Sequence, residues 1–191
     1  MIEIETRQLA GIPVLHAVPA GKRECSLPCI LFYHGFTSSS LVYSYFAVAL
    51  AQAGFRVVMP DAPEHGARFK GNAQERMFRF WHILQQNMQE FTTLRAALVA
   101  ENWLSDERLA VGGASMGGMT ALGIMARHPE VKCVASLMGS GYFTRLAQTL
   151  FPPLQVQTPE QQAEFDAVIA PLVEWDVTHQ LPRLADRPLL L

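Results

Sequence analysis

The sequence predicts an α/β fold in which helices cover both faces of a mostly parallel sheet. Three observations lead to this prediction. Short apolar runs alternate with amphipathic stretches, one run ends in a Gly-x-Ser-x-Gly pentapeptide, and half of the 191 residues are hydrophobic. Alternation of strand and helix is typical of parallel sheets with right-handed crossovers. We expect a single domain over residues 1–191, because this length suits one hydrophobic core.

The chain opens with two segments of alternating hydrophobicity. Residues 2–5 and 12–18 alternate in a way that predicts an antiparallel pair of strands with one exposed face. The next strands are expected in largely apolar runs, which are typical of parallel strands buried on both faces. These runs are residues 29–33, 55–59, 109–111 and 131–135.

Three helices are expected between these strands, over residues 41–53, 73–103 and 116–127, the last of which stops before Pro129. The second helix has apolar side chains at steps of mostly three or four, so one of its faces should pack on the sheet. These side chains are Met77, Phe80, Trp81, Leu84, Met88, Phe91, Leu94 and Leu98.

After residue 138 the alternation of strand and helix stops. Residues 139–186 contain several prolines and a helix start at Thr158, followed by a proline in the first turn. Residues 187–191 then resume a strand pattern. We therefore interpret residues 139–186 as a helical lid inserted between two strands.

Composition excludes several classes of function. The formal net charge is −2, which argues against nucleic-acid binding. The sequence has no apolar run long enough for a membrane span and no secretory signal pattern, so no membrane association is expected. Cys25, Cys29 and Cys133 form no C-x-x-C pair, which favours neither disulfides nor zinc and fits a reducing cytoplasm. Composition leaves the oligomeric state open.

The Gly-Ala-Ser-Met-Gly pentapeptide at residues 113–117 lies between an expected strand and an expected helix. Such a tight turn forces Ser115 into a strained conformation and places its hydroxyl at the carboxyl edge of the sheet, beside a helix N-terminus. We therefore predict that Ser115 is a catalytic nucleophile. The loop 34–36 follows another parallel strand, so the backbone amides of Phe36 and Met116 are the predicted oxyanion hole.

These motifs resemble the α/β-hydrolase superfamily, which places a His-Gly-Phe loop (34–36), an Asp-to-Gly turn (61–66) and the serine pentapeptide (113–117) in this order. Residues 32–45 and 138–143 resemble bacterial carboxylesterases of the YjfP type more closely. The resemblance implies an eight-stranded sheet and a serine esterase that hydrolyses small-molecule carboxylic esters without a cofactor or metal. We interpret Tyr142, Phe143, Leu146, Phe151 and Leu154 as an apolar lid over the acyl group, with ordinary core packing as the alternative. Tyr142, Phe143 and His34 are the candidate substrate contacts, and the alternative for His34 is a structural side chain that packs beneath its loop.

The resemblance further implies a triad in the order serine, acid, histidine. The acid would follow the strand that begins at Arg187 and the histidine would come later, so both would fall beyond Leu191. We therefore expect a C-terminally incomplete fold with little activity, because a serine without a base is a poor nucleophile. His34 and His65 are expected at the carboxyl edge, His34 as a structural side chain beneath its loop and His65 in a turn that lines the pocket mouth. A role as substitute base stays open for both.

Two other possibilities concern the same edge of the sheet. Asp61, Glu64 and His65 are close in sequence, but no second group of ligands follows at a defined spacing, so a metal site is not expected. The alternative function is that of a noncatalytic protein with the same fold, which binds acyl compounds or a protein partner.

Overall fold

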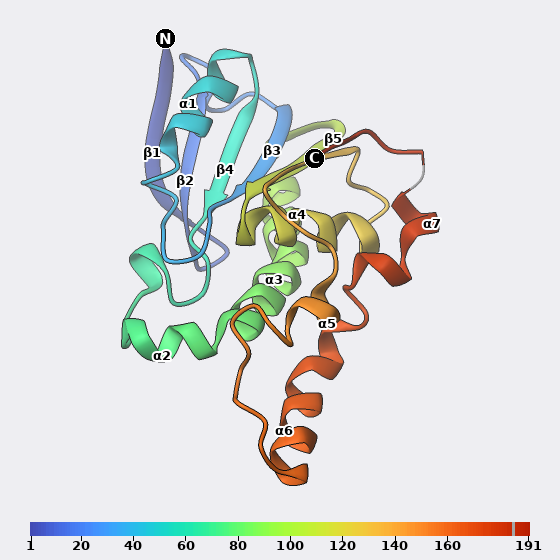
Figure 1. Cartoon of the computed structure of the whole chain (residues 1–191). Helices are drawn as coiled ribbons and strands as arrows, with labels where there is room; N and C mark the ends of the chain where they lie inside the picture. The colour runs from blue at the N-terminus through green and yellow to red at the C-terminus, as the bar shows by residue number, and fades with distance from the viewer. Residues whose placement is uncertain (185) are drawn as a thin grey trace.

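The computed structural model describes residues 1–184 and 186–191, which form one sheet of seven strands (Figure 1). The spatial order is β1-β2-β4-β3-β5-β6-β7. Strand β2 is antiparallel to β1 and β4, and all other neighbours are parallel. The predicted mostly parallel α/β fold is confirmed, with seven strands among the described residues where the resemblance implied eight. The strands are β1 Ile2–Leu9, β2 Ile12–Pro19, β3 Leu27–Tyr33, β4 Arg56–Pro60, β5 Leu104–Ala114, β6 Cys133–Leu137 and β7 Leu189–Leu190.

Helices lie on both faces of this sheet. Helix α1 packs on β1, β2 and β4 from one side, whereas α3 and α4 pack together on the other side. The connection from β6 to β7 contains α5, α6, α7 and two short 3-10 helices, and Figure 1 shows α6 extending away from the sheet. The helices are α1 Ser44–Gln52, α2 Ala73–Phe78, α3 Phe80–Ala100, α4 Met116–Arg127, α5 Phe143–Leu146, α6 Pro159–Ile169 and α7 Leu181–Leu184, and the 3-10 helices are η1 Gly66–Arg68, η2 Ala170–Leu172 and η3 Val177–His179.

Two helices differ from their expected bounds. Helix α1 begins at Ser44, because residues 41–43 form a turn. The single helix expected over 73–103 is divided into α2 and α3 at Arg79, whose φ of −99° and ψ of 7° leave the helical region. Helix α3 begins directly after this break with Phe80, whose side chain is buried in the core and only 2% exposed.

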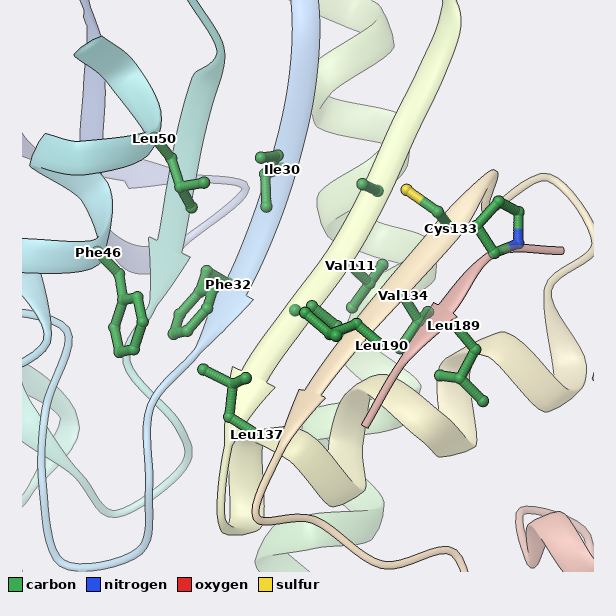
Figure 2. A pocket seen from close by; sticks show the side chains of 14 residues that line it. Ile30, Phe32, Phe46, Leu50, Val111, Cys133, Val134, Leu137, Leu189 and Leu190 are labelled. Carbon is green, nitrogen blue, oxygen red and sulfur yellow. The ribbon is translucent and has the colours of Figure 1, made fainter. Parts of the chain in front are cut away.

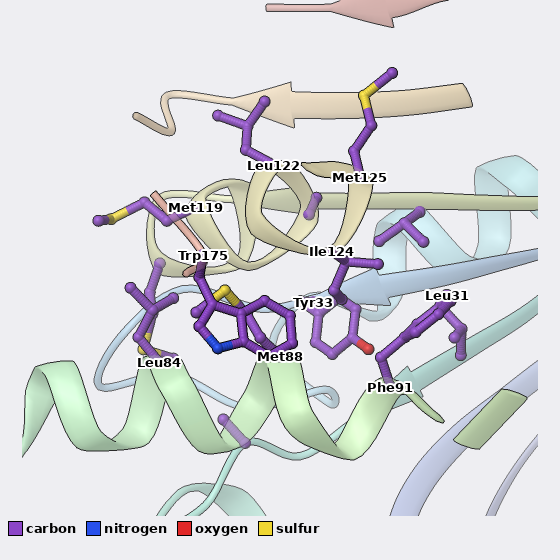
Figure 3. Close-up of a cluster of buried hydrophobic side chains, with 14 of the residues drawn as sticks. Leu31, Tyr33, Leu84, Met88, Phe91, Met119, Leu122, Ile124, Met125 and Trp175 are labelled. Carbon is purple, nitrogen blue, oxygen red and sulfur yellow. The ribbon is translucent and has the colours of Figure 1, made fainter. Parts of the chain in front are cut away.

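The main core fills the space between the sheet and the helices α3 and α4. Figure 3 shows Met88 and Phe91 of α3 beside Tyr33 of β3 and Ile124 of α4. The apolar face predicted for the second helix is buried from Phe80 onward. Burial of each such side chain stabilises the fold by roughly 1.5–3 kcal/mol, so this layer fixes the position of α4 and of the turn before it.

The opposite face of the sheet is covered only in part. Beside α1, the strands β3, β5, β6 and β7 line an apolar hollow of about 470 Å³, which we call the sheet-face cavity (Figure 2). Phe46 and Leu50 of α1 lie on one side of it, and Leu189 and Leu190 of β7 lie on the other. Leu190 is 60% exposed. Across the described residues, no helix combines the length and apolarity needed to cross a membrane.

Candidate functional site

Ser115 occupies the turn between β5 and α4. Its φ of 55° and ψ of −117° lie in a sparsely populated region that costs a non-glycine residue on the order of 1–3 kcal/mol. Two backbone hydrogen bonds hold the turn: the Ser115 amide donates to the Leu137 carbonyl at 2.8 Å, and the Ser115 carbonyl accepts from the Met119 amide at 3.0 Å. The strained conformation expected from the pentapeptide is present, and the residue is exposed.

Glycines allow the segments around Ser115 to approach closely. A Cβ atom on Gly117 would lie 2.0 Å from the Tyr33 carbonyl oxygen, and one on Gly113 would lie 2.3 Å from the carbonyl carbon of Gly117. Only glycine fits at these contacts. On the neighbouring loop, a Cβ atom on Gly35 would lie 3.6 Å from Ser115 Cβ. The structure therefore brings the His-Gly-Phe loop and the serine turn together.

Two backbone amides flank this turn. Phe36 follows Gly35 in the loop after β3, and Met116 is the first residue of α4. Within the described part of the chain, neither amide donates a hydrogen bond to another protein group, whereas the adjacent Thr37 amide donates to His65. Free N–H groups beside an exposed hydroxyl are the donors that a developing oxyanion requires.

His34 and His65 are buried, and both ring nitrogens of each side chain form hydrogen bonds to backbone groups of the loops around the site. In His34, Nδ1 donates to the Gly35 carbonyl at 2.8 Å and Nε2 accepts from the Ala62 amide at 3.0 Å. In His65, Nδ1 donates to the Pro63 carbonyl at 2.7 Å and Nε2 accepts from the Thr37 amide at 3.0 Å. These bonds join the loop after β3 to the loop after β4.

The same bonds exclude His34 and His65 as substitute bases in this conformation. Each imidazole is neutral and protonated on Nδ1, and its single nitrogen lone pair already accepts a backbone N–H. Burial lowers the pKa of both rings, to about 4 for His65. His34, expected to contact substrate, is only 1% exposed and lies beneath the loop.

A hollow of about 400 Å³, the Ser115 cavity, opens beside the serine. None of the described residues that line it carries a charge, and most are apolar. They come from the loops after β3, β5 and β6, from α2, α3, α4 and α5, and from the loop after α5. The lining residues are Phe36, Thr37, Met77, Phe80, Ser115, Met119, Met138, Gly139, Ser140, Leu146, Leu150 and Phe151.

Only part of the expected substrate-contacting set lies on this cavity. Leu146 and Phe151 line it, whereas Phe143 is fully buried and packs toward Trp81. Tyr142 is 56% exposed and lines a neighbouring surface hollow instead. Leu154 lines a further hollow together with Pro152 and residues 155–156. Phe143 points inward because it is the first residue of the short helix α5, whose inner side packs on the core.

Sequence reasoning assigned Met77 and Phe80 to a core stripe, although both also line the Ser115 cavity. The break at Arg79 places the start of α3 beside the loop that carries Phe36, and periodicity contains no signal for that break. The Ser115 hydroxyl has no hydrogen-bond partner among the described residues. Over those residues, no group of three or more His, Cys, Asp or Glu side chains is arranged to hold a metal ion.

A parallel sheet with a strained serine at its carboxyl edge, between a strand and a helix, defines a class of protein. The chain belongs to the α/β-hydrolase family, whose model, described as alpha/beta hydrolase fold, matches residues 28–190. Over all 191 residues, the chain is 70% identical to Esterase YjfP of Escherichia coli (strain K12) and spans 77% of its length.

Solved structures share the fold at low sequence identity. TT1662 from Thermus thermophilus superposes with a TM-score of 0.66 at 19% identity, covering 100% of this chain and 88% of that one. An acylaminoacyl peptidase from Pyrococcus horikoshii gives a TM-score of 0.66 at 13% identity, covering 100% of this chain and 36% of that one. At these identities the likeness shows the architecture alone.

Proposed function

We propose that the protein is a serine esterase that hydrolyses small-molecule carboxylic esters through an acyl-enzyme on Ser115. The observation that carries the proposal is the strained, exposed Ser115 between the unpaired amides of Phe36 and Met116. Identity of 70% over all 191 residues to a protein named as an esterase supports the choice of ester over other acyl substrates.

The proposed reaction has two steps. Ser115 Oγ attacks the ester carbonyl carbon while its proton passes to a base, and the carbonyl oxygen becomes an oxyanion held by the Phe36 and Met116 amides. The carbonyl then re-forms, the bond to the alcohol oxygen breaks, and the alcohol leaves with the proton. Water repeats the sequence on the acyl-enzyme, so that the acid is released and Ser115 regains its hydroxyl.

We expect ester hydrolysis by residues 1–191 to be slow. Among the described residues, no imidazole forms a hydrogen bond with the Ser115 hydroxyl, and the nitrogen lone pairs of His34 and His65 already accept backbone amides. Serine hydrolases that lose one triad member retain roughly 10³–10⁴-fold acceleration over water from the oxyanion hole and binding. We therefore expect weak activity that depends on Ser115, and expect added free imidazole to raise it by supplying the base.

The remaining parts of the proposal concern the surroundings of the site. Residues 139–186, of which Ala185 lies outside the described residues, would act as the lid, because Leu146, Leu150 and Phe151 from this segment line the Ser115 cavity. We also propose a cytoplasmic protein that uses no cofactor. The free thiols of all three cysteines are compatible with a reducing compartment.

The test is covalent labelling with a fluorophosphonate, followed by mass spectrometry to locate the adduct. We expect slow phosphonylation of Ser115 and slow hydrolysis of p-nitrophenyl butyrate, both lost in Ser115→Ala. Ser26→Ala removes an exposed serine just before β3 and should leave both unchanged. Equal hydrolysis by wild type and Ser115→Ala would refute the nucleophile. A protein that binds acyl compounds without any adduct would instead favour the noncatalytic alternative.

A further inference from the structure

Three aromatic rings form one side of the Ser115 cavity. Phe36 follows β3, Phe80 begins α3, and Phe151 belongs to the connection between β6 and β7. Their ring centroids are 5.0 Å apart for Phe36 and Phe80, 5.3 Å for Phe36 and Phe151, and 4.9 Å for Phe80 and Phe151. Each ring therefore contacts the other two, and we call this group the aromatic triangle.

Phe151 is held in the triangle by its neighbours against its own backbone preference. Its φ of 47° is in the left-handed region, which is costly for a bulky residue. The indole of the buried Trp81 donates from Nε1 to the Leu150 carbonyl at 2.9 Å and so fixes the peptide just before Phe151. Such a conformation persists only where surrounding contacts determine it, so the position of this ring is specified by the fold.

Phe36 links the triangle to the reacting atoms. Its amide is a proposed oxyanion donor, and its ring is one member of the triangle. A carbonyl group bound at that amide would therefore project its substituent next to the aromatic rings. Thr37, Ser115 and Ser140 supply the only side-chain hydroxyls of the described lining, and no lining side chain is charged. Burying a carboxylate among these side chains would be unfavourable, because none of them could pair with its charge. The Arg76 guanidinium lies outside this lining, over the Phe36 ring at 5.8 Å, and donates to the Glu64 carbonyl.

We propose that the Ser115 cavity binds neutral aliphatic acyl groups and that Phe151 is the specificity-determining residue that limits their length. The proposal rests on the proposed function, because the Phe36 amide orients the acyl group. Removing the Phe151 ring should lengthen the cavity, since Phe36 and Phe80 are held from other segments. Phe80 is 2% exposed, and the Phe36 ring also packs on His65 at 5.2 Å.

The test measures binding of linear primary amides, from propanamide to decanamide, by calorimetry or NMR titration. These compounds present an acyl chain and are not expected to react. For wild type, affinity should rise by up to about fourfold per methylene, the equivalent of about 0.8 kcal/mol, and stop rising once the chain meets Phe151. In Phe151→Ala the rise should continue, so that decanamide binds about tenfold more tightly than to wild type, while propanamide changes less than twofold.

Two further variants keep the test decisive. Phe151→Trp enlarges the ring and should stop the rise at a shorter chain, which covers the case that Phe151→Ala fails to fold. Phe78→Ala removes an exposed phenylalanine of α2 that does not line the cavity, so its binding profile should match that of wild type. Succinamate, which ends in a carboxylate, should bind at least tenfold more weakly than butanamide.

Three results would overturn the proposal: amides that fail to bind, a chain-length limit that neither Phe151 variant moves, or succinamate that binds as well as butanamide. Repeating the titration on Ser115→Ala separates this proposal from the catalytic one. Amide binding with the expected limit but no phosphonate adduct would refute catalysis alone. An adduct on Ser115 without a limit set by Phe151 would refute the specificity assignment alone.

Discussion

The Ser115 cavity and the sheet-face cavity are similar in volume, about 400 and 470 Å³, but they differ in the backbone that surrounds them. Four residues that line the Ser115 cavity have a positive φ although none is glycine, namely Thr37, Ser115, Met138 and Phe151. No lining residue of the sheet-face cavity does, among the residues that the structure describes. Strain that the fold maintains is concentrated at functional sites.

Apolar volume alone therefore does not locate a functional site. The sheet-face cavity is the larger and the more apolar of the two, yet regular strands form much of its wall, and among the described residues Cys133 has the only lining side chain with a hydrogen-bonding group. The Ser115 cavity lies where several strands end, which is where parallel α/β sheets place their ligands. Variants that change the backbone strain or the charge at one cavity should therefore leave the other cavity unaffected.

The largest effect is expected where close backbone approach creates the strained turn. In Gly117→Ala the added methyl group would meet the Tyr33 carbonyl oxygen at 2.0 Å and the His34 carbonyl oxygen at 2.9 Å. Because both partners are backbone atoms, β3 and α4 must separate, and we expect a loss of at least about 3 kcal/mol in the free energy of unfolding. Urea denaturation measures this loss, and labelling of Ser115 should disappear with it.

Gly71→Ala is the matched control for this variant. A Cβ atom on Gly71 has no neighbour within 4 Å, so the same chemical change should alter stability by less than about 0.5 kcal/mol. If Gly117→Ala were as stable as Gly71→Ala, the close contact between β3 and α4 would be absent in solution. Close backbone contact would then not be the cause of the strained conformation at Ser115.

Acid should act on the loops of the Ser115 cavity, whereas the described residues that line the sheet-face cavity include no His, Asp or Glu. Burial lowers the pKa of His65 to about 4 from an ordinary value of 6.5, so the unfolded chain takes up this proton first as the pH falls. This contribution to stability is complete above pH 6.5 and is lost progressively as the pH falls to about 4, where the accumulated loss is on the order of 3 kcal/mol. Protonation also removes the acceptor of the Thr37 amide and so loosens the loop after β3.

Urea unfolding of wild type and His65→Gln at several pH values between 7 and 4.5 measures this contribution. The variant should be less stable at pH 7 but should show a shallower decline with acid. Some decline remains, because burial lowers the pKa of His16 to about 4 as well and shifts His34 and His128 in the same direction. Identical slopes for the two proteins would show that His65 is not held neutral by the fold.

The sequence was informative where a local pattern determines the structure. The serine turn needs only small residues at 113 and 117, which its own pentapeptide contains, and the buried face of α3 follows from side chains three and four residues apart. Both features depend on neighbours in the chain. The fold class, the strand pairing at the N-terminus and the strain at Ser115 could therefore be predicted.

Features that depend on distant contacts could not be predicted in this way. The aromatic triangle joins Phe36, Phe80 and Phe151, three segments that no periodicity connects. Whether Phe143 faces the core or the substrate depends on how a four-residue helix packs. The lone pair of His65 Nε2 accepts the Thr37 amide, which lies 28 residues away in the sequence. The sequence contains no sign of this contact, so a role of His65 as a base stayed open.

The smallest effect is expected when the same substitution is placed at each cavity. Leu190 is 60% exposed at the sheet-face cavity, so Leu190→Lys keeps its ammonium group in water and should change the free energy of unfolding by no more than about 0.5 kcal/mol. It should also reduce self-association, because a lysine opposes pairing of an apolar strand edge with another chain. Amide binding at the Ser115 cavity should stay at the wild-type level.

Leu146→Lys instead places a charge in the uncharged lining of the Ser115 cavity, where Leu146 is half-buried, and should weaken octanamide binding at least tenfold. Calorimetric titration measures amide binding by both variants, and size-exclusion chromatography measures their self-association. If both variants lost amide binding equally, the two cavities would be coupled, and the difference in backbone strain would not separate a binding site from a site without function.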